Sequence, residues 1–148
     1  MPDFRTIVMV GHCGPDMSLL KSAVNRAVPG ATIVSVNDLA ALQPHLSAAV
    51  LLLVNRALDG EFDTESGVEL IEQIHNRNHP PAMMLISNYE DSQAQAVQAG
   101  ALPGFGKAHL YAERTMQRLR EAAATTVHHG RGEGGADWAD VTRQSSTA

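Results

Sequence analysis

Hydrophobic residues gather in five short runs along this chain, separated by segments in which apolar positions recur at helical spacing. The clearest run, residues 49–55, holds six apolar residues in succession before Asn55 and Arg56 end it. Such a run is typical of a strand buried on both faces, as in a parallel sheet covered by helices. Similar runs predict strands at residues 6–10, 31–36, 82–86 and 101–105. Pro103 and Gly104 weaken the last of these, which suits an edge strand.

The intervening segments predict five helices. Pro15 fits a first helical turn because it has no N–H to leave unpaired. Asn37 or Asp38 can cap a short second helix, and Gly100 fits the end of the fourth. The expected helices cover residues 15–28, 39–46, 67–74, 91–99 and about 108–124. Five β-α units in succession predict an α/β fold: a doubly wound, flavodoxin-like parallel sheet of five strands in the order 2-1-3-4-5, with helices on both faces.

Length and composition fit one domain followed by a tail. The chain has 148 residues, of which 44% are hydrophobic and 18% charged, and residues 1–124 are expected to form the domain. Residues 125–148 mix glycines with charges and end in a polar stretch, which is typical of a flexible tail. Trp138 is the one bulky aromatic residue there. We prefer to interpret it as an unstructured tail residue rather than as a docking anchor for a partner or a symmetry mate.

Charge and cysteine content narrow the class of protein. A net charge of -5 and a pI near 5.7 disfavour a dedicated nucleic-acid binder. Cys13 is the single cysteine, so no internal disulfide forms, which favours a reducing compartment. The first residues lack the apolar core of a signal peptide, and no apolar run approaches the roughly 20 residues that span a bilayer. We expect a cytoplasmic protein with no nucleic-acid or membrane partner.

Several segments, taken in order, resemble the receiver domain of two-component response regulators over roughly residues 5–124. They are the glycine-led helix start at residues 67–71, Ser87 after the fourth strand, and the Ala-Gly-Ala turn at residues 99–101 followed by Lys107. In that family an aspartate ending the third strand is phosphorylated, and an acidic pair after the first strand helps hold Mg²⁺. The serine or threonine and the lysine contact the phosphoryl oxygens.

The sequence has the serine and the lysine of this set but lacks the phosphoacceptor aspartate and the acidic pair. Asn55 stands at the phosphoacceptor position, and a carboxamide is not an anionic nucleophile. The acidic pair falls on His12 together with Gly11 or Cys13, so the oxygen ligands that Mg²⁺ prefers are missing. The aromatic switch position falls on Gly104. The resemblance thus implies a pseudo-receiver, in which the Lys107 ammonium can donate to the Asn55 amide oxygen and hold the pocket in one state.

The function that follows is a non-catalytic regulatory module that works through protein–protein contact and needs no cofactor or metal. A signalling or output protein is the expected partner, and a homodimer is a second option. The resemblance places the contact surface on the fourth helix, fifth strand and fifth helix. On this chain that surface comprises Gln95, Gln98, Tyr111, Arg114 and Arg118.

Two alternatives stay open. The first is a phosphorylatable receiver with an unconventional acceptor; Asp59 lies close in sequence but beyond the strand end. The second is a small-ligand or metal-binding domain that uses His12, Cys13 and Ser87, although two adjacent ligands are not a zinc spacing. The alternating acids of the loop at residues 57–66 suggest Ca²⁺, but the glycine and the last acid of a calcium loop are absent, so we interpret it as a solvated acidic loop.

Overall fold

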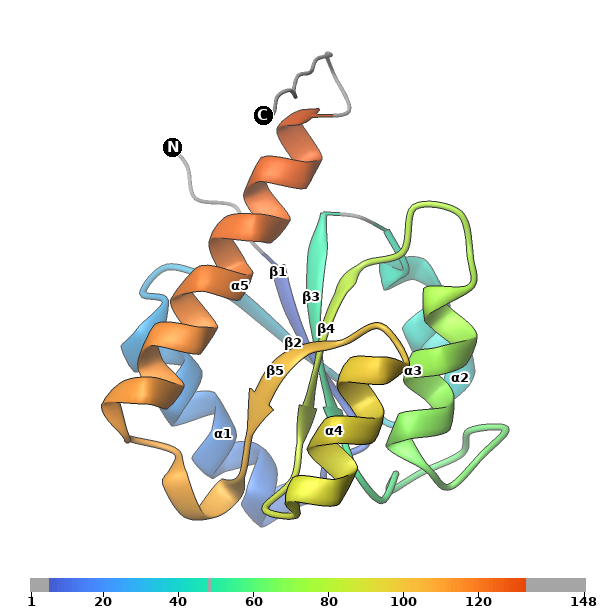
Figure 1. Ribbon diagram of the computed structural model, residues 1–148, viewed down its shortest axis with the longest axis horizontal. Coiled ribbons are helices and arrows are strands. Elements are labelled where there is room, and N and C mark those ends of the chain that lie inside the picture. The colour runs from blue at the N-terminus through green and yellow to red at the C-terminus, as the bar shows by residue number, and fades with distance from the viewer. Residues whose placement is uncertain (1–5, 48, 133–148) are drawn as a thin grey trace.

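The computed structural model describes residues 6–47 and 49–132, which form one sheet with helices on both faces (Figure 1). All five strands are parallel, in the order β2-β1-β3-β4-β5. This confirms the predicted fold class and strand order. The strands are β1 (Thr6–Val10), β2 (Thr32–Val36), β3 (Val50–Asn55), β4 (Ala82–Ile86) and β5 (Leu102–Phe105).

The helices divide between the two faces of the sheet. One buried cluster joins the sheet to α1 and α5, and a second joins it to α2, α3 and α4. Of the two predicted candidates, Asn37 and Asp38, it is Asp38 that caps α2, because its carboxylate accepts from the Ala41 N–H at 2.7 Å. The helices are α1 (Gly14–Ala27), α2 (Leu39–Leu42), α3 (Gly67–His75), α4 (Glu90–Gln98) and α5 (Glu113–Gly132), with short 3₁₀ turns η1 (Gln43–His45) and η2 (Lys107–His109).

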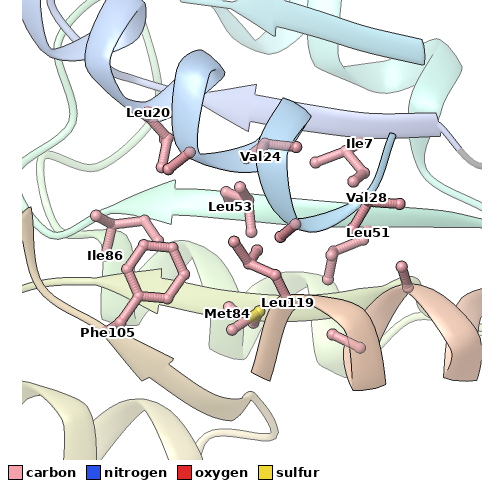
Figure 2. Packing of buried hydrophobic residues seen from close by; sticks show 14 of the residues in the cluster. Ile7, Leu20, Val24, Val28, Leu51, Leu53, Met84, Ile86, Phe105 and Leu119 are labelled. Carbon is pink, nitrogen blue, oxygen red and sulfur yellow. The ribbon is translucent and has the colours of Figure 1, made fainter. Parts of the chain in front are cut away.

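Burial on both faces explains why β3 carries no polar alternation. Leu51 and Leu53 of β3 point toward α1 and α5, where they meet Leu119, as Figure 2 shows. Leu52 and Val54, the alternate positions, belong to the opposite cluster. All four side chains are fully buried, so truncating any of the three leucines to alanine costs about 2–5 kcal/mol.

The fifth helix differs from its predicted bounds of about 108–124 at both ends. It begins at Glu113, because the chain first makes η2 and the Thr115 hydroxyl then donates to the His109 carbonyl at 2.7 Å. It continues to Gly132, since a helix that has already formed gains one hydrogen bond per added residue, which outweighs its late glycines. Residues 125–132, assigned by sequence to the tail, are therefore helical. Residues 133–148, including Trp138, lie outside the described residues.

The second helix is shorter than predicted. It ends at Leu42, and the chain continues as η1, in which Pro44 occupies the first turn and offers no N–H to an α-helical ladder. Across residues 6–47 and 49–132, no helix combines the length and the apolar character that crossing a membrane requires.

Candidate functional site

The carboxyl ends of the strands meet around Asn55, the last residue of β3. Its side-chain nitrogen donates to the carbonyls of Gly11 and Ala57, both at 2.9 Å. Its side-chain oxygen accepts from the Lys107 ammonium at 3.3 Å, which confirms the contact expected from the sequence. Since the two carbonyls can only accept, this position requires a donor. An aspartate here would direct an anionic oxygen at backbone carbonyls.

Lys107 has a second partner that sequence reasoning missed. Its ammonium lies 2.6 Å from a carboxylate oxygen of Asp16, in the first turn of α1. Hydrogen bonding to Lys107 is the main cause that lowers the pKa of the Asp16 carboxyl, and a hydrogen bond from Cys13 adds to it. The available signal was an acid on the turn after β1, which faces the same sheet edge as the lysine.

The loop at residues 57–66 closes over this edge. The Asp59 N–H donates to the Gly11 carbonyl at 2.9 Å, and the Asn37 side chain donates to the Asp59 carbonyl at 2.8 Å. A Cβ on Gly11 would lie 2.7 Å from the Leu58 side chain, and its φ of +75° also favours glycine. The four acids of the loop, Asp59, Glu61, Asp63 and Glu65, are exposed. Asp59 is therefore held by its backbone, with its carboxylate in solvent.

His12 is part of the core rather than the pocket surface. Only 1% of it is exposed, and its Nε2 lies 2.9 Å from the Leu53 carbonyl, so Nε2 carries the proton and donates. Its buried Nδ1 has no hydrogen-bond partner within the described part of the chain. Burial is the main cause that lowers the His12 pKa to about 4, and the charge of Lys107 lowers it further. The imidazole is neutral at physiological pH.

The candidate metal ligands His12, Cys13 and Ser87 are not brought together as a ligand set. His12 faces β3, Cys13 donates to Asp16, and the Ser87 hydroxyl accepts from the Tyr89 N–H at 3.0 Å. Over residues 6–47 and 49–132, no three His, Cys, Asp or Glu side chains gather closely enough to hold a metal ion.

Ser87 and Lys107 nevertheless line one hollow with Asn55. This hollow, of about 210 Å³, opens at the carboxyl end of the sheet. At its mouth the Arg56 guanidinium stacks on the ring of Tyr89, 4.9 Å from the centroid. The structure therefore joins the three residues that sequence placed in a degenerate phosphorylation pocket.

Gln93 of α4 is a second residue that sequence reasoning missed. Its side-chain nitrogen lies 2.9 Å from the Leu85 carbonyl, 3.1 Å from that of Ser87 and 3.3 Å from that of Phe105. Its oxygen accepts from the Gly104 N–H at 3.2 Å. One side chain thus ties α4 to the ends of both β4 and β5. Sequence gives no sign of this role, since glutamine on a helix is usually exposed.

At Gly104, where the resemblance would place a switch aromatic, β5 lies close to β4. A Cβ on Gly104 would stand 2.1 Å from the Leu85 carbonyl oxygen and 2.9 Å from the Gln93 side chain. Nearby, the Asn88 side chain accepts from the Ala108 N–H at 3.0 Å, which ties the β4–α4 loop to η2. No side chain fits at Gly104 without moving the backbone.

Two of the five predicted contact residues border a second hollow, of about 350 Å³, between α4 and α5. Arg114 and Arg118 line it, and Arg118 also donates to the Gly104 carbonyl. Gln95 and Gln98 are exposed on α4. Tyr111 is 49% exposed, and the Arg26 guanidinium of α1 lies 5.4 Å from its ring centroid, so Tyr111 borders α1 as well.

Comparison with known proteins places this architecture. No family model matches the chain, and no curated protein matches it by sequence. A response regulator from Thermotoga maritima is 16% identical, with a TM-score of 0.58 over 84% of this chain and 98% of that one. The NarL receiver domain from Mycobacterium tuberculosis is 19% identical, with a TM-score of 0.53 over 86% and 98%.

A response regulator from Burkholderia pseudomallei, solved with a phosphorylated aspartic acid, a calcium ion and citrate, is 17% identical. Its TM-score is 0.53, over 90% of this chain and 76% of that one. Identities this low show the fold alone. The chain therefore has the fold of a response-regulator receiver domain.

Proposed function

We propose that this chain is a receiver-like signalling module that is not phosphorylated on aspartate and acts through protein–protein contact. One observation carries the proposal: the Lys107 ammonium, which in receivers contacts a phosphoryl group, is bound to Asp16 at 2.6 Å and to Asn55 at 3.3 Å. Both partners are internal, so the cation is neutralised without a phosphoryl group. The pocket is complete as it stands.

The chemistry of Asn55 supports the same proposal. An acyl phosphate needs a carboxylate nucleophile, and Mg²⁺ needs hard oxygen ligands to offset the incoming charge. The side-chain amide of Asn55 already donates to two backbone carbonyls. Among the described residues, Asp16 provides the one carboxylate that pairs with Lys107. A metal recruited by Asp16 would have to displace the lysine.

Contact with another protein is the remaining way for such a module to signal. We assign that contact to the α4–β5–α5 face, defined by Gln95, Gln98, Tyr111, Arg114 and Arg118. Gln93 holds the strands and the helix of this face in one arrangement, so a partner meets a preformed surface. We further propose that the module is non-enzymatic, works in the cytoplasm and pairs with a signalling or output protein or with a second copy.

Intact-mass spectrometry after incubation with Mg²⁺ and acetyl phosphate or phosphoramidate tests the proposal. Native protein is expected to gain no phosphoryl mass, while a typical receiver treated in parallel does. Asn55→Asp is run alongside to ask whether restoring the nucleophile alone is sufficient. We expect little adduct on it, since the acids that hold Mg²⁺ are still absent.

A stoichiometric adduct on native protein would contradict the proposal. Asp16 is then the first acceptor to examine, because its carboxylate lies inside the pocket. Loss of the adduct in Asp16→Asn, with retention in Asp59→Asn, would establish the alternative of an unconventional acceptor.

A further inference from the structure

The hollow of about 350 Å³ lies between α4 and α5, which flank edge strand β5 (Figure 1). Its lining carries charges of both signs. Arg114 and Arg118, one turn apart on α5, supply two positive charges, and Glu90, in the first turn of α4, supplies one negative charge. His109 is the one other titratable side chain among the lining residues that the structure describes. The volume falls within the range of about 300–1,000 Å³ that is typical of small-molecule sites.

These charges do not neutralise one another. In the part of the chain that the structure describes, no ion pair joins Glu90 to Arg114 or Arg118. The Arg114 side chain has no hydrogen-bond partner among those residues either. Arg118 donates to the Gly104 carbonyl through one nitrogen, and its guanidinium has further N–H donors for a second acceptor. The hollow therefore presents two cationic groups and one anionic group to whatever enters it.

The walls of this hollow are fixed by hydrogen bonds within the chain. Gln93 ties α4 to the ends of β4 and β5. The Asn88 side chain accepts from the Ala108 N–H and so holds the β4–α4 loop against η2. The Thr115 hydroxyl donates to the His109 carbonyl, which fixes the start of α5. Because the site is preformed, a ligand has little conformational entropy to remove from the protein on binding.

A ligand that uses all three charges must itself carry both signs. Two guanidinium groups one turn apart can share one carboxylate, since each presents several N–H donors in a plane. The Glu90 carboxylate can accept from an ammonium group. An anion without a cationic group would leave Glu90 facing a like charge, and a cation without an anionic group would face two arginines. A free α-amino acid carries an ammonium and a carboxylate on a single carbon atom.

We propose that the hollow between α4 and α5 binds a free α-amino acid, with its carboxylate on Arg114 and Arg118 and its ammonium on Glu90. The inference goes beyond the proposed function and does not depend on it, because it uses only the lining of this hollow. Where both hold, the amino acid is a small-molecule input to the module, and it changes the charge that the α4–β5–α5 face presents to a partner.

Amide chemical shifts of the ¹⁵N-labelled full chain test this proposal. Each standard L-amino acid is titrated to millimolar concentration, and at least one is expected to shift the amides of Glu90, Gly106 and Arg114 to saturation. For that amino acid, two analogues are titrated next: the acid that lacks the amino group and the amine that lacks the carboxyl group. Each analogue is expected to bind at least about tenfold more weakly, since it lacks one charged contact.

Two variants remove the charges one at a time. Arg114→Gln and Glu90→Gln change exposed side chains that have no partner among the described residues, so both variants are expected to fold. Each is expected to weaken binding of the amino acid about tenfold. Arg77→Gln and Asp91→Asn are the matched controls, because both residues are exposed and neither lines the hollow. The controls are expected to bind with unchanged affinity.

Three results would overturn the proposal. The first is the absence of saturable shifts with every amino acid. The second is equal affinity for the amino acid and for the acid that lacks its amino group, which would make the hollow a simple anion site. The third is binding that survives both Arg114→Gln and Glu90→Gln, which would place the ligand elsewhere on the protein.

Discussion

The β1–β3 side and the β4–β5 side of the pocket differ in how far their residue types match those of a receiver. On the β1–β3 side, His12 is buried against β3 and Asn55 fills the strand end with an amide. On the β4–β5 side, Ser87 and Lys107 keep the residue types that a receiver uses. In this structure the Ser87 hydroxyl accepts a backbone N–H and the Lys107 ammonium binds Asp16. Retained residue types therefore do not imply a retained activity, because their partners decide what they do.

The β4–β5 side is also where the movement of a switch would be expected, and it is tied down most heavily. Gln93 joins four backbone groups, and Gly104 leaves no room for a side chain. The comparison predicts that substitutions at Gln93 and Gly104 destabilise the fold, while a substitution in the half-buried Lys107–Asp16 ion pair does little.

Restoring an aromatic residue at the switch position is expected to have the largest effect. In Gly104→Tyr the new Cβ meets the Leu85 carbonyl and the Gln93 side chain, so β5 must move away from β4. We expect a loss of about 3 kcal/mol or more in the free energy of unfolding, measured by urea denaturation. Pro103→Ala, the exposed neighbour, is the control. Near-native stability of Gly104→Tyr would show that the β4–β5 side is not locked.

Lowering the pH is expected to reduce the stability of the protein through His12, on the β1–β3 side of the pocket. Its pKa is about 4 when folded and 6.5 unfolded, so between these values the unfolded chain binds a proton that the folded chain does not. Stability is therefore full above pH 6.5 and falls as pH drops toward 4, by up to roughly 3 kcal/mol. Asp16, whose pKa is lowered below 3.8, stabilises the fold above that pH, and this stabilisation is lost only as the pH falls further.

Urea titrations across that pH range measure the His12 effect, with His12→Gln as the comparison. Glutamine retains an N–H for the Leu53 carbonyl but does not titrate, so its stability curve is expected to be flatter with pH. Equal slopes for the two proteins would remove His12 as the cause.

Removing the Gln93 side chain is expected to have an intermediate effect on stability. Gln93→Ala removes the side chain that bonds the carbonyls of Leu85, Ser87 and Phe105, at a cost of about 2 kcal/mol. Gln95→Ala, two residues along the same helix and exposed, is expected to stay within about 0.5 kcal/mol of the native protein. A neutral Gln93→Ala would mean that backbone packing alone holds α4.

The smallest effect is expected at the ion pair. The side chains of Lys107 and Asp16 are 28% and 34% exposed, and pairs that solvent reaches contribute little. Asp16→Asn is therefore expected to cost less than about 1 kcal/mol in urea denaturation. A loss of stability as large as that of Gln93→Ala would show that the ion pair contributes as much as Gln93 to holding the pocket together.

The local sequence pattern predicted those features that depend on residues close together in the sequence. The apolar run of β3, the Asp38 cap and the edge strand at Pro103 follow from burial, capping and proline chemistry. The Asn55–Lys107 contact followed from the resemblance. Asp16 and Gln93 were missed because their partners lie on other elements: 91 residues separate Asp16 from Lys107. The start of α5 is set by η2 and its end by helix propagation, and neither could be predicted from composition.

Relaxation dispersion on the ¹⁵N-labelled protein tests the central claim, a pocket held in one state, most directly. The method detects exchange on the microsecond-to-millisecond timescale typical of such switching. The amides of Ser87, Asn88, Gly104 and Lys107 are expected to give flat profiles, because Gln93, Asn88 and Asp16 hold this edge together. Exchange concentrated on these amides would show a second populated state and contradict the account.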